Sequence, residues 1–120
     1  MEFKSKKSIY LQIADYICEC ILREEWKEDE KIPSIRDIAV TLEVNPNTVT
    51  RTYRYLEEQG IISIQRGVGY FVSKNAYDII LDLKKETFFK EELPELFRMM
   101  KLLSITIQDV LKFYNKWAKK

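Results

Sequence analysis

Histidine is absent from this 120-residue sequence, and cysteine, glycine and proline are scarce, with two, three and three residues. Without histidine, the usual nucleophile and base pairs of hydrolytic enzymes cannot form. The two cysteines, Cys18 and Cys20, stand two apart in a helical pattern. They therefore face different directions and lack the further ligands of a closed metal site. We predict reduced thiols, no enzymatic activity, no metal site and no cofactor.

Long hydrophobic runs and a strong net charge are also missing. No run approaches the length of a membrane helix, and residues 1–7 lack an apolar signal segment, so we expect a cytoplasmic protein with no membrane partner. The composition, 46% hydrophobic and 32% charged, is typical of a globular protein. Because the net charge is only +1, any affinity for nucleic acid must come from local groups of cationic side chains.

The sequence is organised around residues 33–72, where the pattern predicts two helices followed by a hairpin. A short helix is predicted to begin after the N-cap Ser34 and to end where its apolar spacing breaks. A second helix should begin after the cap Asn45, with Pro46 in its first turn, and should end before Gly60. Two helices joined by so short a turn indicate a helix-turn-helix.

The second helix has two different faces. Val49, Tyr53 and Leu56 share one side, which should face the core. The first turns also carry amide, hydroxyl and guanidinium groups that can point outward: Asn47, Thr48, Thr50, Arg51 and Arg54. Such groups suit DNA, because arginine can bond guanine and asparagine adenine in bidentate fashion, and a helix N-terminus favours phosphate. On the helix pattern alone, an ordinary solvated face is an equal alternative.

A β-hairpin is predicted directly behind this helix. Residues 61–65 and 70–72 are rich in β-branched and aromatic residues, and they flank Arg66, Gly67 and Gly69. A cationic tip with two glycines can bring backbone close to phosphate, and a narrow minor groove attracts arginine. A plain turn is the alternative reading of the glycines. Because the hairpin follows a capped recognition-type helix, we interpret it as a wing.

These blocks resemble, in order and spacing, the winged-helix domain of GntR-family bacterial transcription regulators over residues 9–73. The segments that carry the resemblance are Ile9-Tyr10-x-Gln12-Ile13-Ala14, Pro33-Ser34-Ile35-Arg36-Asp37, Val44-Asn45-Pro46-Asn47-Thr48-Val49 and Arg66-Gly67-x-Gly69. The short C-terminal part resembles the YtrA-like subfamily. Two positions depart from the family pattern: residues 27–31 lack the usual Pro-Gly pair, and Thr52 stands where alanine is common.

The resemblance implies a homodimeric, sequence-specific regulator of transcription, expected to be a repressor on an inverted-repeat operator in double-stranded DNA. The second helix would enter the major groove, and the wing would reach the adjacent minor groove. The residues predicted to contact DNA are Ser34, Arg36, Asn45, Pro46, Asn47, Thr48, Thr50, Arg51, Arg54, Arg66, Gly67 and Gly69. A winged-helix module that binds protein instead of DNA is the alternative. The sequence leaves a small-molecule effector unknown. Because 120 residues are too few to hold it, we do not expect the pyridoxal-phosphate-binding domain that some family members carry.

The predicted fold class is mainly α with a small β-hairpin. A winged helix-turn-helix DNA-binding domain should occupy residues 1–74, with a helix over residues 8–23 covering its core, and an α-helical dimerisation region should occupy residues 75–120. Residues 78–103 are mainly helical, and Pro94 leaves open whether they form one kinked helix or two.

The dimerisation region carries two amphipathic stripes with little to pack on. A second copy is the expected cover, because exposed apolar surface is unfavourable in water, and folding back onto the first domain is the alternative. The residues predicted at the dimer interface are Leu93, Leu96, Phe97, Met100, Leu103, Ile107, Val110, Leu111, Tyr114 and Trp117. The last helix should follow the cap Thr106, and we expect the chain to end naturally at Lys120.

Overall fold

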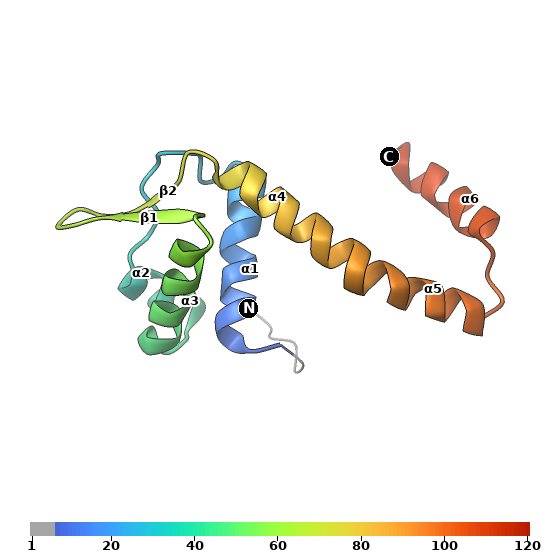
Figure 1. Cartoon of the computed structure of the whole chain (residues 1–120), viewed down its shortest axis with the longest axis horizontal. Coiled ribbons are helices and arrows are strands. Elements are labelled where there is room, and N and C mark those ends of the chain that lie inside the picture. The colour runs from blue at the N-terminus through green and yellow to red at the C-terminus, as the bar shows by residue number, and fades with distance from the viewer. Residues whose placement is uncertain (1–6) are drawn as a thin grey trace. The chain divides into compact units, whose positions relative to one another are not determined.

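The computed structural model describes residues 7–120, which form six α-helices, one π-helical segment and one antiparallel hairpin (Figure 1). The elements in chain order are α1 (Ile9–Leu22), α2 (Ile35–Leu42), α3 (Pro46–Glu58), β1 (Ile62–Gln65), β2 (Gly69–Val72), α4 (Ala76–Thr87), η1 (Phe88–Glu92), α5 (Leu93–Leu102) and α6 (Ile107–Ala118). The predicted fold class, mainly α with a small hairpin, is confirmed. Among the described helices, none is both long enough and apolar enough to cross a lipid bilayer.

Two compact units divide the chain, Met1–Asp82 and Leu83–Lys120. The first unit extends beyond the hairpin because the start of α4 contributes to its core, where Ala76 and Ile80 are fully buried. The expectation that no signal segment opens the chain falls almost entirely on residues 1–6, which lie outside the described residues.

The core of the first unit forms where α3 packs against α1, α2 and β1. The buried side chains of α3 are Val49, Thr52, Tyr53 and Leu56. Ile13 and Ile17 of α1 are fully buried as well. The predicted core face of the second helix is therefore confirmed, and its other face is left for solvent or a ligand.

Side-chain caps and left-handed residues set the ends of α2 and α3. The hydroxyl oxygen of Ser34 accepts the Asp37 backbone N–H at 3.1 Å, and the side-chain oxygen of Asn45 accepts the Asn47 N–H at 2.8 Å. These bonds satisfy N–H groups that have no partner inside the helix. Gly60 has a φ of 78°, the left-handed conformation expected just past a helix end. Both predicted helix starts and the predicted end at Gly60 are confirmed.

The loop between α1 and α2 makes its turn without a Pro-Gly pair. The Glu30 N–H donates to the Lys27 carbonyl at 3.0 Å. Asp29, between them, has a φ of 66°, which aspartate tolerates better than most residues. Just beyond, Lys31 pairs with Phe71 in an antiparallel bridge. The loop thus extends the sheet next to β2 and ties the start of α2 to the hairpin.

The second unit resolves the question left open at Pro94. The π-helical segment η1 ends just before α5, and Pro94 lies in the first turn of α5. Thr87, Glu92 and Leu93 all keep right-handed helical backbone angles, so no break separates η1 from its neighbours. Proline lacks an N–H and its ring crowds the carbonyl of Lys90, four residues earlier. A wider π turn relieves that crowding without ending the helix.

Tyr53 connects three parts of the first unit. Its hydroxyl donates to the carbonyl of Pro33, just before α2, at 2.6 Å, and its ring packs edge-to-face on Tyr70 of β2 with centroids 4.8 Å apart. Burial raises the pKa of this hydroxyl far above its ordinary value, and Tyr70 and Asp37 add to the rise. Tyr53 therefore stays a neutral donor and holds α3, the start of α2 and the hairpin together.

Replacing Tyr53 with phenylalanine tests this connection. We expect Y53F to lower the free energy of unfolding by about 1–2 kcal/mol, because the ring still packs but the Pro33 carbonyl loses its partner. Urea denaturation at a fixed protein concentration measures the change. Y77F removes a hydroxyl from an exposed ring and serves as the matched control, expected to unfold like the wild type. Equal stability of Y53F and wild type would contradict the role given to this bond.

Candidate nucleic-acid interface

The outward side of α3 is rich in hydrogen-bond donors. Asn47, Arg51 and Arg54 are exposed, while Thr48 and Thr50 are half-buried beside them. Within residues 7–120 neither arginine forms an ion pair. Both guanidinium groups can therefore bind an anionic ligand. This surface combines amide and guanidinium donors with the N-terminal end of a helix, a combination that suits phosphates and base edges.

An aromatic ring supports Arg51 from a different helix. The Cζ atom of Arg51 lies 3.9 Å from the centroid of the Tyr10 ring on α1. This is a close cation–π contact. Sequence reasoning missed Tyr10 as part of the site. Tyr10 does belong to the segment at 9–14 that carries the family resemblance. No local sequence pattern, however, indicates that its side chain contacts Arg51, which lies on another helix.

The predicted hydroxyl groups differ in what they can still donate. The Thr50 hydroxyl donates to the Pro46 carbonyl at 3.0 Å, so its proton is used inside the helix. The Ser34 oxygen accepts a backbone N–H, which leaves its own proton for an outside acceptor. Arg36, in the first turn of α2, is exposed and forms no ion pair within the described residues. The start of α2 therefore presents one guanidinium and one hydroxyl donor.

The hairpin forms as predicted, and its tip requires glycine. β1 and β2 pair in an antiparallel register with Gln65 opposite Gly69, and the Val68 N–H closes the tip by donating to the Gln65 carbonyl at 2.9 Å. Gly67 and Gly69 have φ angles of 77° and 143°. Side chains other than hydrogen are unfavourable in these conformations. Arg66 is exposed at the tip, which lies on the side of the unit where α2 and α3 lie in the view of Figure 1.

A second cation lies beside the wing. A Cβ atom added to Gly69 would lie 2.7 Å from the Cε atom of Lys31, so the Lys31 side chain passes directly over this glycine. Lys31 forms no ion pair within residues 7–120, unlike Lys74, which pairs with Asp29 at 3.3 Å. Sequence reasoning missed Lys31, because the bridge between its loop and β2 is a long-range contact.

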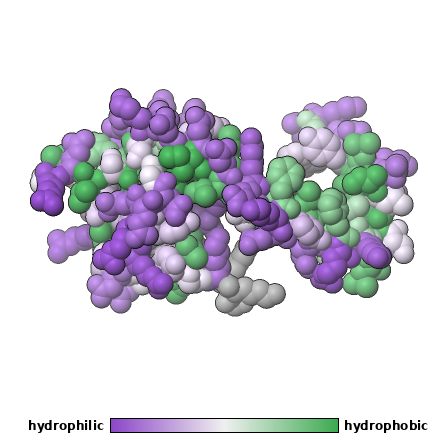
Figure 2. Space-filling model, viewed as in Figure 1, coloured by the Kyte–Doolittle hydropathy of each residue, from purple (hydrophilic) through white to green (hydrophobic). Residues whose placement is uncertain are grey.

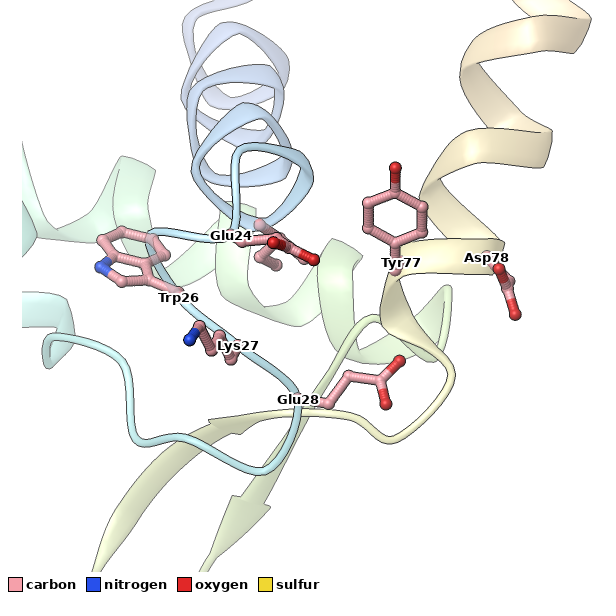
Figure 3. A pocket seen from close by; sticks show the side chains of 7 residues that line it. Glu24, Trp26, Lys27, Glu28, Tyr77 and Asp78 are labelled. Carbon is pink, nitrogen blue, oxygen red and sulfur yellow. The ribbon is translucent and has the colours of Figure 1, made fainter.

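A concavity of about 390 Å³ lies elsewhere in the first unit, between the loop after α1 and the start of α4 (Figure 3). Its lining mixes aromatic and charged side chains: Ile21, Glu24, Trp26, Lys27, Glu28, Tyr77 and Asp78. The labelled side chains do not converge on one point, and Asp78 points away from the others (Figure 3). This surface therefore lacks the convergent polar groups of a defined ligand site.

The predicted DNA-contact residues of α2, α3 and the hairpin all belong to the first compact unit. A short helix, a second capped helix with exposed donors and a glycine-containing hairpin together define a winged helix-turn-helix. Residues 9–72 match the family described as bacterial regulatory proteins, gntR family. The chain belongs to this GntR family of DNA-binding transcription regulators.

Two curated relatives from Bacillus subtilis resemble the chain over most of its length. It is 40% identical over 111 residues to the uncharacterised HTH-type transcriptional regulator YhcF. The matched residues make up 92% of this chain and 90% of YhcF. The chain is 39% identical over 93 residues to the HTH-type transcriptional repressor YtrA, with 78% and 71% covered. The predicted resemblance to GntR-family and YtrA-like regulators is confirmed.

Solved structures agree with this assignment. A transcriptional regulator of the GntR family from Bacteroides thetaiotaomicron has a TM-score of 0.77 and 44% identity, with 93% of this chain and 97% of that chain covered. AraR(DBD), solved in complex with operator ORX1, has a TM-score of 0.54 and 25% identity, with 60% and 93% covered. A protein similar in structure to 60% of this chain has therefore been solved in complex with an operator.

Alanine at the two wing glycines should have unequal effects. We expect G67A to cost about 1 kcal/mol of unfolding free energy, because its φ is left-handed and the space around it is open. G69A should cost about 2–3 kcal/mol, because its φ of 143° is strained for alanine and its Cβ would displace Lys31. Urea denaturation of both variants measures the difference. Equal losses would contradict the extra cost that we assign to the φ angle of Gly69 and to its contact with Lys31.

Proposed function

We propose that this protein is a homodimeric repressor that binds an inverted-repeat operator in double-stranded DNA in the cytoplasm. The observation that carries the proposal is a set of exposed arginines on one compact unit that form no ion pair within residues 7–120: Arg36, Arg51, Arg54 and Arg66. Such cations are what a polyanion requires. A partner protein would need a matching acidic surface, and no feature of the site favours that alternative.

Each element has its own part in the proposed complex. The N-terminal turns of α3 enter the major groove, where Asn47, Thr48 and Arg51 meet base edges. Pro46 and Asn45 bring the backbone of the helix start towards a phosphate. Arg36 and Ser34 add contacts from α2. The wing places Arg66, Gly67 and Gly69 at the adjacent minor groove, and Lys31 adds a phosphate contact at its base.

The proposal of a dimer rests on the second unit. Its helices leave most of their apolar side chains in solvent in a single chain, including Leu103 at 58% exposure and Trp117 at 70%. Of residues 83–120, Met100 alone among the apolar residues is buried, so it contributes less to an interface than its position in the stripe predicts. Figure 2 shows many apolar side chains at the surface of this unit. A second copy would cover them.

Symmetry connects the dimer to the operator. Two copies related by a two-fold axis present two α3 helices, and such a pair matches two half-sites of an inverted repeat. Repression is the part proposed by similarity: YtrA is a repressor, and AraR(DBD) is solved on an operator. A dimer on a promoter can repress simply by occupying it.

Arginine substitutions test the DNA interface. We expect R51A and R36A each to weaken operator binding by about 1–3 kcal/mol, because each would remove a contact to a base or phosphate. R66A should weaken binding more uniformly across sequences and reduce the salt slope by about one. Fluorescence anisotropy with genomic fragments selected by the wild type measures these losses. R23A removes a guanidinium paired with Glu19 on α1 and is the control. Wild-type affinity of R51A and R36A would refute the assignment of α3 and the start of α2 to the DNA interface.

Charged residues in the apolar stripe test the dimer. We expect the double variant L96E/L103E to sediment as a monomer, because burying two carboxylates in an apolar interface costs several kcal/mol. The variant K101E changes an exposed polar position of α5 and should stay dimeric. Sedimentation velocity at matched concentrations distinguishes the two results. A monomeric wild type would rule out the dimer while leaving the DNA contacts to be tested separately.

A further inference from the structure

Tyr10 contacts the recognition helix in three ways. Its backbone carbonyl accepts the Thr52 hydroxyl at 2.7 Å. Its ring packs edge-to-face on Tyr55 with centroids 6.3 Å apart, and the ring centroid lies 3.9 Å from the Cζ atom of Arg51. These contacts hold the Tyr10 ring in place relative to α3. Arg51 therefore lies against a ring whose position is set by the packing of α1 on α3.

The hydroxyl of Thr52 supports this arrangement with a buried hydrogen bond. Thr52 is fully buried, and its hydroxyl reaches both the Tyr10 carbonyl and, at 3.1 Å, the Thr48 carbonyl. An alanine at this position could not make this bond between helices. Thr52 therefore adds a connection between α1 and α3 at the level of Tyr10.

Stacking leaves the hydrogen-bonding edge of a guanidinium untouched. The attraction to the ring acts through the flat face of the group, whereas its N–H donors lie in the plane and point outward. An unsupported arginine side chain loses about 2 kcal/mol of rotamer entropy when it is fixed. An arginine held against a ring has already lost part of that freedom, so less is lost on binding a base.

We propose that Tyr10 is a positioning residue for sequence recognition: its ring holds the Arg51 guanidinium with its N–H edge directed outward to bond a guanine in the major groove. The inference rests on the proposed function and deepens it, because it assigns to α1 a part in reading the operator. Tyr10 acts through Arg51 and need not touch DNA itself. The role requires an aromatic ring and does not require its hydroxyl.

A double-mutant cycle tests the proposal. Y10L should weaken binding to a selected genomic operator by about three- to thirtyfold, the range of a cation–π contact, while Y10F should stay within about twofold of wild type. In the R51A background, Y10L should change affinity by less than about twofold, because the two residues act as one unit. The matched control Y77L removes an exposed ring from α4 and should bind like wild type.

The free protein provides a second readout that needs no DNA. In ¹³C-resolved NMR spectra, the side-chain protons of Arg51 should be shifted by the Tyr10 ring current in wild type and in Y10F, and this shift should vanish in Y10L. Thermal unfolding of Y10L shows whether it folds. Should Y10L not fold, the cycle is run with Y10M, which has an unbranched apolar side chain and no ring, in the wild-type and R51A backgrounds. Y10M should lose affinity only when Arg51 is present.

The outcomes separate the two ideas. Losses that are additive in the cycle, or Arg51 shifts unaffected by the loss of the ring, overturn the role of Tyr10 while a specific wild-type complex keeps the proposed function. A wild type that binds no selected fragment better than random DNA overturns the proposed function, and the role of Tyr10 in recognition with it. Coupled losses together with the ring-current shift support both.

Discussion

The buried hydroxyl and ring of Tyr53 are the constraint on which the arrangement of the first unit depends. This one side chain belongs to α3, bonds the chain just before α2 and packs on β2. The distance between the arginines of the helices and the arginine of the wing is set by these contacts. A double-stranded DNA has fixed groove spacing, so a protein that contacts two grooves needs such a rigid junction.

The distribution of charge matters more here than its total. Several cations away from the proposed interface are paired with carboxylates, including Lys74 with Asp29 and Arg98 with Glu95. The arginines of α2, α3 and the wing have no such partners within the described residues. A chain with a net charge of only +1 can therefore still present a cationic surface, because its acidic residues neutralise other regions.

Local physical chemistry made much of the fold predictable. Caps such as Ser34 and Asn45, the proline in the first turn of α3 and the left-handed Gly60 act within a few residues, so they can be recognised without a structure. The core face of α3 follows from helical periodicity alone. The cap at the start of α6, a capping box of Thr106 and Asp109, was likewise predictable and is present. Which groove each donor would reach came only from the family resemblance.

By itself the sequence determined the elements of residues 33–72, their ends, the buried face of α3 and the cationic tip, because these depend on neighbours in the chain. It left open whether residues 78–103 form one helix or two and did not predict the π-helical segment η1. Only the tertiary structure decided that the ring of Tyr10 lies under Arg51, that Lys31 passes over Gly69 and that Thr52 bonds α1. Each of these contacts joins residues far apart in sequence, and no periodicity or capping rule reports on such pairs. They arise when helices pack, since packing brings particular side chains together.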